Sequence, residues 1–111
     1  MYGTIARLRV KPGAAGDLAS ITSGYEELAV PGFVASYLYQ ADGDDDEFWM
    51  SVIFVDRESY FLNAQDPAQD ARYREMRALL AADPEWHDGH IVATAGTGAT
   101  TGGPGAAGGG F

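Results

Sequence analysis

The residues FWMSVIFVDRESYFLN occupy positions 48–63 and join the most apolar part of the chain to a helix start. Positions 48–55 are apolar except for Ser51, a pattern typical of a strand that is covered on both faces. Asp56 follows, and its carboxylate can accept hydrogen bonds from the first amides of a helix. The passage therefore predicts a buried strand followed at once by a helix that begins near Arg57.

Hydrophobic periodicity on either side of this passage predicts the other elements. The predicted strands are at 2–10, 33–40, 48–55 and 86–93, and the predicted helices are at 14–29, 57–65 and 67–82, with a polar hairpin tip at 42–47. Asp66-Pro67 separates the last two helices, because a capping residue followed by proline is typical of a new helix start. The order βαββαβ, in which 57–65 and 67–82 are two pieces of the second helix, predicts an α+β, ferredoxin-like antiparallel sheet with two helices on one face.

The composition divides the chain into a folded part and a tail. Positions 94–111 contain only Gly, Thr, Ala, Pro and one Phe. Such a segment cannot bury enough apolar surface to offset the entropy cost of ordering it. We therefore expect one folded domain at 1–93 and a flexible Gly/Ala/Thr-rich tail at 94–111.

Charge and composition exclude several classes of partner. The chain has 16 acidic and 7 basic residues and a net charge of −9, which disfavours binding to nucleic acid and to anionic membranes. It has no cysteine, no apolar run long enough for a transmembrane helix, and a start unlike a signal peptide. We therefore expect a cytoplasmic protein that binds neither nucleic acid nor membrane.

Both faces of the predicted sheet are apolar, which indicates a second copy of the chain. The strand 48–55 directs two apolar sets in opposite directions: Phe48, Met50, Val52 and Phe54 on one side, and Trp49, Ile53 and Val55 on the other. The strand 33–40 is predicted to place Phe33, Tyr37 and Tyr39 on one side and Val34 and Leu38 on the other. Since the helices can cover only one face, we expect a homodimer in which two sheets pack together as a central barrel. Arg7 or Arg9 is then expected to form an intersubunit ion pair.

These residues resemble a known family. The start ARLRVKPG at 6–13 and the two-sided βαββαβ sheet resemble the dimeric α+β barrel superfamily, in particular its antibiotic biosynthesis monooxygenase branch. The stretch FVDRESYFLN at 54–63 resembles that branch's passage from a strand end through a cap into the second helix, and the continuation from Pro67 to Leu80 resembles its next helix. The resemblance covers about 1–93 and implies a substrate cavity between the sheet and the helices.

The resemblance also limits the chemistry. The haem-degrading members use an Asn in the first strand, a Trp at the end of the third and a His on the second helix, where this chain has Ala6, Phe54 and Asn63. Asn63 cannot bind haem iron as an imidazole does, so haem degradation is not expected. The remaining family chemistry is monooxygenation of phenols or quinols without metal, flavin or any other cofactor, because the substrate itself supplies electrons to dioxygen.

Such an enzyme must bind an aromatic ring in a dry cavity and favour its phenolate. The resemblance suggests Asn63, Tyr60 and His90 as catalytic candidates and Phe48, Met50, Phe54 and Tyr73 as substrate-binding candidates. Plain core packing of the aromatic residues and a local hydrogen bond of Asn63 remain alternatives. His87 and His90 lie three apart on a strand and point to opposite faces, so no metal site is expected there.

Two functions stay open. The first is a cofactor-independent monooxygenase acting on a small aromatic molecule. The second is a non-catalytic homodimer that binds a small ligand, or assists a pathway, with the same cavity.

Overall fold

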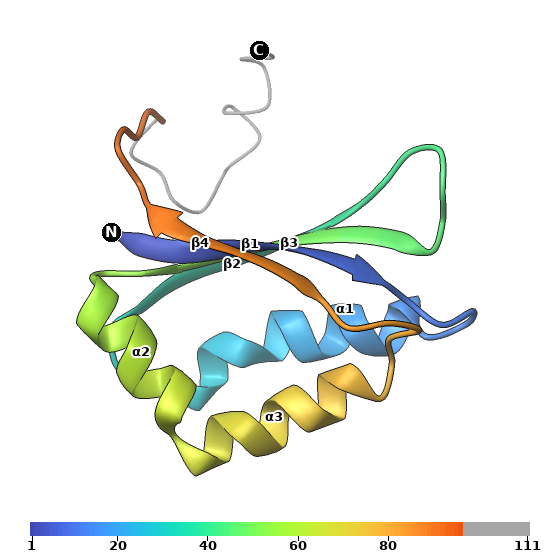
Figure 1. Ribbon diagram of the computed structural model, residues 1–111, viewed down its shortest axis with the longest axis horizontal. Coiled ribbons are helices and arrows are strands. Elements are labelled where there is room, and N and C mark those ends of the chain that lie inside the picture. The colour runs from blue at the N-terminus through green and yellow to red at the C-terminus, as the bar shows by residue number, and fades with distance from the viewer. Residues whose placement is uncertain (97–111) are drawn as a thin grey trace.

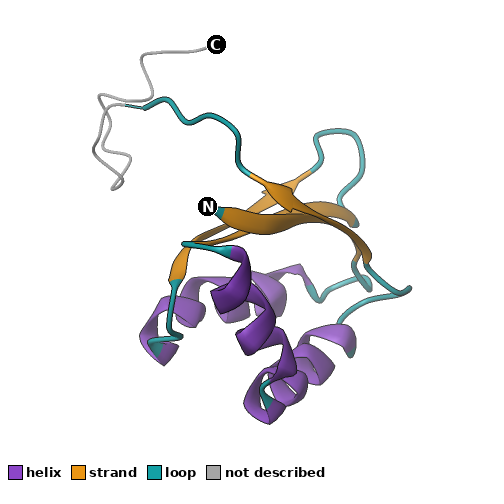
Figure 2. Ribbon diagram, turned by 60° about the vertical axis from the view of Figure 1, so that its left-hand side comes forward, coloured by secondary structure: helices purple, strands orange, loops and turns teal. Residues whose placement is uncertain are grey.

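The computed structural model describes residues 1–96 and confirms the ferredoxin-like α+β architecture. The elements in chain order are β1 (Tyr2–Arg9), α1 (Ala15–Gly24), the short 3₁₀ helix η1 (Tyr25–Leu28), β2 (Phe33–Gln40), β3 (Glu47–Phe54), α2 (Arg57–Gln65), α3 (Pro67–Arg77) and β4 (Glu85–His90). The strands form one antiparallel sheet in the order β2-β3-β1-β4. All the helices lie against one face of this sheet, as Figures 1 and 2 show. Most of the expected tail, namely 97–111, lies outside the described residues.

The predicted helix starts at 57 and 67 are confirmed with their caps. The Asp56 carboxylate accepts a hydrogen bond from the Ser59 amide at 2.7 Å, and this contact lowers the pKa of Asp56. Asp66 accepts from the Ala68 amide at 2.8 Å, and Pro67 occupies the first helical turn. The two caps therefore hold α2 and α3 as separate helices under the sheet.

The first helical region is shorter and less regular than predicted. The expected helix at 14–29 runs as α-helix only to Gly24 and continues as the 3₁₀ helix η1. Glycine weakens a helix interior, which explains the change of helix type at this position. The segment closes at Ala29 in a left-handed conformation, with φ of 51°. The change matters for the site because Tyr25 begins η1.

The helix α3 and the strand β4 also end earlier than predicted, because the backbone that follows each of them has different hydrogen-bond partners. The helix expected to reach residue 82 ends at Arg77, since the Ala81 amide donates to the Arg9 carbonyl of β1 at 2.8 Å instead of continuing the helix. The strand expected to reach residue 93 ends at His90, which lies opposite Tyr2 at the start of β1. Beyond this point β1 offers β4 almost no further backbone to pair with.

The core lies between the helix-facing side of β1 and the helices α1 and α3. The alternation read from the sequence is confirmed, because Ala6, Leu8 and Val10 are at most 1% exposed. Leu18 of α1 and Leu80 after α3 are fully buried against them. Thr4 and Tyr2 lie on the same side of β1, closer to α2. At this end the side chains pack less tightly and a cavity forms.

The predicted face of Phe33 is wrong because β2 contains a register shift. Phe33 lies opposite Phe54, but Ala35 already lies opposite Ile53, so one extra residue is accommodated between them. The shift turns Phe33 to the helix side, where its ring centroid lies 4.8 Å from that of Tyr25 and 5.8 Å from that of Phe54. Alternation alone cannot reveal such a shift.

The far face of the sheet carries exposed apolar side chains and two arginines. Arg7 donates to Glu47 at 2.6 Å, and Arg9 donates to Asp44 at 2.6 Å. Both partners belong to the same chain, and the two ion pairs hold the β2–β3 hairpin against β1. The expected intersubunit ion pair stays a prediction. The Arg9 guanidinium also holds the pKa of Asp44 below its usual value. In the part of the chain described, no helix has the length and apolarity needed to cross a membrane.

Candidate functional site

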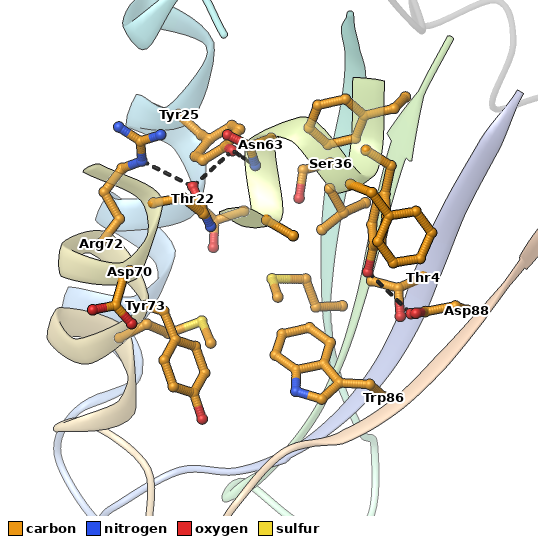
Figure 3. A pocket seen from close by; sticks show the side chains of 18 of the residues that line it. Thr4, Thr22, Tyr25, Ser36, Asn63, Asp70, Arg72, Tyr73, Trp86 and Asp88 are labelled. Carbon is orange, nitrogen blue, oxygen red and sulfur yellow. Dashed lines mark hydrogen bonds between the residues drawn. The ribbon is translucent and has the colours of Figure 1, made fainter. Parts of the chain in front are cut away.

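A cavity of about 440 Å³ lies between the sheet and the helices (Figure 3). This volume falls within the range of small-molecule sites. The apolar part of its lining comes from every helix and from the central strands: Ile21, Met50, Val52, Phe54, Phe61 and Met76. The polar side chains gather in two groups, one on the helices and one next to β4. The cavity is thus an apolar space with hydrogen-bonding groups on two sides.

Two aromatic rings border the cavity between these polar groups. Tyr73 of α3 and Trp86 of the edge strand β4 face each other in Figure 3, with ring centroids 6.3 Å apart. Trp86 is 43% exposed although it lines the cavity. A planar ligand can therefore contact both rings while Trp86 shields it from solvent.

The polar group on the helices is a chain of hydrogen bonds that ends at Asn63. Arg72 Nε donates to Gln69 Oε1 at 2.9 Å, and the Tyr25 hydroxyl donates to the same oxygen at 3.1 Å. Asn63 Nδ2 then donates to the Tyr25 oxygen at 3.1 Å (Figure 3). The four residues come from η1, α2 and α3, so this chain of bonds ties three helical segments together.

The direction of each bond in this chain follows from Arg72. A guanidinium only donates, so the Gln69 atom that receives Arg72 must be the carbonyl oxygen. That oxygen takes the single Tyr25 proton, so Tyr25 can only accept from Asn63. The Asn63 amino group is therefore turned towards Tyr25, and the Asn63 carbonyl oxygen is left to accept a hydrogen bond from a ligand.

The second polar group lies where α2 meets β1 and β4. The Tyr60 hydroxyl donates to Asp88 Oδ1 at 3.0 Å. Burial raises the pKa of Tyr60, and the Asp88 carboxylate raises it further, so the phenol keeps its proton at neutral pH. Thr4 is next to Asp88 across the β1–β4 pair and lines the same wall. Among the described residues, its buried hydroxyl oxygen has no hydrogen-bond partner.

Five of the seven candidates named from the sequence lie at the cavity. They are Asn63, Tyr60, Met50, Phe54 and Tyr73. Phe48 does not line it, because it lies opposite Leu8 at the other end of β3 from Phe54 and packs in the core. His90 does not line it either. Its ring lies edge-on to Tyr2, with centroids 4.9 Å apart, at the exposed end of β4.

The sequence reasoning missed several polar lining residues. Gln69 and Arg72 lie three apart on α3, a spacing that places them on one helix face with Tyr73 and could have indicated them. Trp86 and Asp88 alternate on β4 towards the helix side, a signal that was also available. Tyr25 carried no such signal, because its position depends on the change from α-helix to 3₁₀ helix at Gly24.

The two histidines lie on opposite faces, as predicted. His87 is opposite Ile5, whereas His90 is opposite Tyr2. Residues 1–96 contain no cluster of three or more His, Asp or Glu side chains arranged to hold a metal ion.

Comparison of the sequence with known families identifies one family, and comparison with solved structures identifies one fold. The profile of the family described as antibiotic biosynthesis monooxygenase matches residues 1–76. No curated protein matches the chain in sequence.

Solved structures share the architecture. SnoaB, a cofactor-independent oxygenase from Streptomyces nogalater, superposes with a TM-score of 0.71 at 19% identity over 84% of this chain and 94% of that one. A protein from Chloroflexus aurantiacus described as a candidate antibiotic biosynthesis monooxygenase has a TM-score of 0.71 at 28% identity, covering 87% of this chain and 98% of that one. A similarly described protein from Bordetella bronchiseptica has a TM-score of 0.70 at 16% identity, covering 83% and 97%.

Proposed function

The chain belongs to the antibiotic biosynthesis monooxygenase family, and we propose that it is a cofactor-independent monooxygenase acting on a small phenol or quinol in the cavity between sheet and helices. The observation that carries the proposal is the oriented Asn63 carboxamide at the wall of an aromatic-lined cavity. An apolar space with a few fixed polar groups is what a phenolic ring requires. SnoaB, which has the same fold, is described as a cofactor-independent oxygenase.

In this mechanism the substrate supplies the electrons, and the protein holds the substrate in position. A substrate CH₂ group next to an ionised phenol loses one proton, and the resulting carbanion gives two electrons to dioxygen, so that a hydroperoxide forms on that carbon. Loss of the second C–H proton then supplies two more electrons, which cleave the O–O bond. One oxygen atom remains as a carbonyl on that carbon, and the other leaves as water with the two hydrogens. The Asn63 oxygen accepts from a neutral hydroxyl of the substrate, not from the ionised phenol, and fixes the orientation of the substrate, while Tyr73 and Trp86 contact the ring. The mostly apolar lining limits the contact of water with the reactive carbanion.

Dioxygen consumption tests this proposal. Purified protein, stripped of metal by chelation, is expected to consume one dioxygen per molecule of an anthrone or a naphthoquinol, as measured with an oxygen electrode. Addition of EDTA should leave the rate unchanged. The proposal fails if none of a panel of anthrones and quinols stimulates oxygen uptake above the rate without protein, or if activity follows bound haem, flavin or iron.

Tyr25→Phe tests the orientation of Asn63. The variant keeps the ring but removes the hydroxyl that accepts from Asn63 and donates to Gln69. Loss of one orienting hydrogen bond is expected to lower kcat/KM about 5- to 10-fold. The wild-type protein is the reference. A wild-type rate for Tyr25→Phe would show that Tyr25 does not act through Asn63.

A non-catalytic ligand-binding protein is the second candidate. The observation that favours it is the pKa of Tyr60, which burial and Asp88 raise away from neutrality, so this phenol cannot act as a base. Asn63 is not a base either. The two functions separate in one experiment, since a binder would take up an aromatic ligand with micromolar affinity and consume no dioxygen above background.

We also propose that the protein is a homodimer joined through the far face of the sheet. Ile5, Tyr37, Tyr39 and Trp49 are between 37% and 60% exposed on that face. Adjacent strands bring them together, because Tyr39 is opposite Trp49 and Ser51 is flanked by Tyr37 and Ile5. A soluble acidic chain rarely leaves such an apolar patch in water. A second copy of the same face covers it with matching shape and polarity.

The mass in solution tests the dimer. Light scattering after size exclusion is expected to give twice the chain mass of 11.8 kDa at micromolar concentration. An interface of roughly 1,200–2,000 Å² is the usual size for a stable complex and is of the order that two such sheet faces can bury. A stable 11.8 kDa species across the micromolar range would contradict the proposal.

A further inference from the structure

We propose that Thr4 and Tyr60 form a subsite for one neutral hydroxyl group of the ligand, and that Asp88 is the residue that positions Tyr60 for this task. The subsite lies on the β1–β4 wall of the cavity, away from the Asn63 group (Figure 3). The inference rests on the proposed function only in requiring that the cavity binds a small aromatic molecule. It does not require that the molecule reacts.

The Tyr60 hydroxyl is fixed as an acceptor by its partner. A phenol has one proton, and the Tyr60 proton is directed to Asp88 Oδ1 at 3.0 Å. The ring itself is held edge-on by Tyr2 and Phe54, with centroids 5.2 Å and 5.7 Å away. The Tyr60 oxygen can therefore only accept. In the free protein burial and Asp88 raise the pKa of Tyr60, and the neighbouring Thr4 hydroxyl lowers it somewhat, although it is too far or too poorly aligned to count as a hydrogen bond. A ligand hydroxyl that brings its own proton can take this place.

Thr4 supplies the complementary group. Its side chain is 5% exposed, and within residues 1–96 its oxygen has no hydrogen-bond partner, although a buried hydroxyl usually has one. Thr4 lies between Val52 and Asp88 in the register of the sheet, on the side that lines the cavity. A threonine hydroxyl can both donate and accept, so it can give a hydrogen bond to the oxygen of a ligand hydroxyl.

The two groups together distinguish between oxygen types. A neutral hydroxyl donates to the Tyr60 oxygen and accepts from Thr4, so it satisfies both. An ether oxygen can accept from Thr4 but has no proton for Tyr60. An ionised oxygen also lacks that proton, and it would face the Asp88 carboxylate. The Arg72 group on the helices is the better place for an ionised oxygen, because its guanidinium is positive. The subsite therefore selects a ligand with a neutral hydroxyl directed towards β1 and β4.

A ligand pair that differs by one methyl group tests the subsite. The dissociation constants of 2,6-dihydroxynaphthalene and 6-methoxy-2-naphthol are measured by calorimetry at pH 7 with 2-naphthol as reference. The wild-type protein is expected to bind the dihydroxy compound roughly tenfold more tightly than the methoxy compound, as one hydrogen bond allows. The preference measures the hydrogen bond to Tyr60, which only the dihydroxy compound can make. Thr4→Val, which keeps the shape but removes the hydroxyl, should weaken the binding of both compounds severalfold relative to 2-naphthol, because each loses the hydrogen bond from Thr4. Thr4→Ser restores the hydroxyl and should restore both affinities.

Thr22→Val is the matched control. Thr22 also contributes to the cavity lining, but its hydroxyl already donates to the Leu18 carbonyl at 2.9 Å. This variant should keep the wild-type affinities for both compounds. Asp88→Ala tests whether Asp88 positions Tyr60. Without Asp88 the Tyr60 proton is free to bond the methoxy oxygen, an effect that loss of a purely structural contact would not produce. The affinity for the methoxy compound should then rise severalfold relative to the dihydroxy compound.

The outcomes separate the subsite from the proposed function. Equal affinity of the wild-type protein for the two compounds, or affinities for both that Thr4→Val leaves unchanged, overturns the subsite while the cavity still binds aromatics. Failure of all three naphthols to bind contradicts both proposals. Binding of the naphthols with the expected preference, but no oxygen uptake with the anthrones and quinols, supports the subsite and contradicts the monooxygenase.

Discussion

Asn63→Ala is expected to lower the rate of dioxygen uptake about 100-fold or more while leaving the fold intact. Removing one preorganised polar group at a reacting centre typically costs a factor of 10² to 10³ in turnover. The Asn63 carboxamide is such a group, because Tyr25 holds its amino end at 3.1 Å and leaves its oxygen for the substrate. The measurement is kcat by oxygen electrode at saturating quinol, with circular dichroism to check the fold.

Gln65→Ala is the control for this variant. Gln65 is an exposed amide at the end of the same helix and does not line the cavity. Its replacement should change the rate by less than about twofold, because exposed positions without partners rarely matter. If Asn63→Ala retained more than a tenth of the wild-type rate, Asn63 would be a packing residue of the cavity wall and the catalytic role would have to be assigned elsewhere.

The fold was predictable because its decisive signals are local. The alternation over 2–10 and the cap at Asp56 each require only neighbouring residues, and both agree with the structure. The face of Phe33 was not predictable, because the register shift in β2 exists only relative to β3. The same holds for the ends of α3 and β4, which are determined by hydrogen bonds to β1.

The cavity residues also divide into those that a local pattern predicts and those that depend on pairing between distant strands. Tyr60 and Asn63 share a face of α2 by their spacing of three, so a resemblance to the family and a helical pattern were enough to place both. Alternation on β4 could have placed Asp88 on the helix side, but that Asp88 lies beside Thr4 follows only from the β1–β4 pairing. The contact of Tyr60 with this wall therefore depends on the sheet register, which no local pattern contains.

That register depends on a glycine, and Gly3→Ala is the stability prediction with the largest effect. A Cβ built on Gly3 would lie 2.0 Å from the Val52 carbonyl oxygen and 3.0 Å from its carbon, both in the backbone of β3. Backbone atoms of a central strand cannot rotate away as a side chain would, so β1 and β3 would have to separate locally. We expect a loss of about 3 kcal/mol or more in the free energy of unfolding, at the upper end of overpacking effects. Thermal unfolding should shift down by at least about 12 °C at fixed protein concentration.

Gly89→Ala is the control that isolates this contact. Gly89 lies opposite Gly3 in the β1–β4 pair, but a Cβ there would meet no atom within 4 Å. Because alanine restricts the unfolded chain, this variant should be neutral or stabilising by up to about 1 kcal/mol. Thr4 follows Gly3 directly, so the forced separation of β1 from β3 should also displace Thr4 from the Tyr60–Asp88 wall. Gly3→Ala that remains folded should therefore bind both 6-substituted naphthols more weakly relative to 2-naphthol, whereas Gly89→Ala should keep the wild-type affinities. Unchanged stability of Gly3→Ala would show that β1 and β3 are not in the close contact on which the register of Thr4 depends.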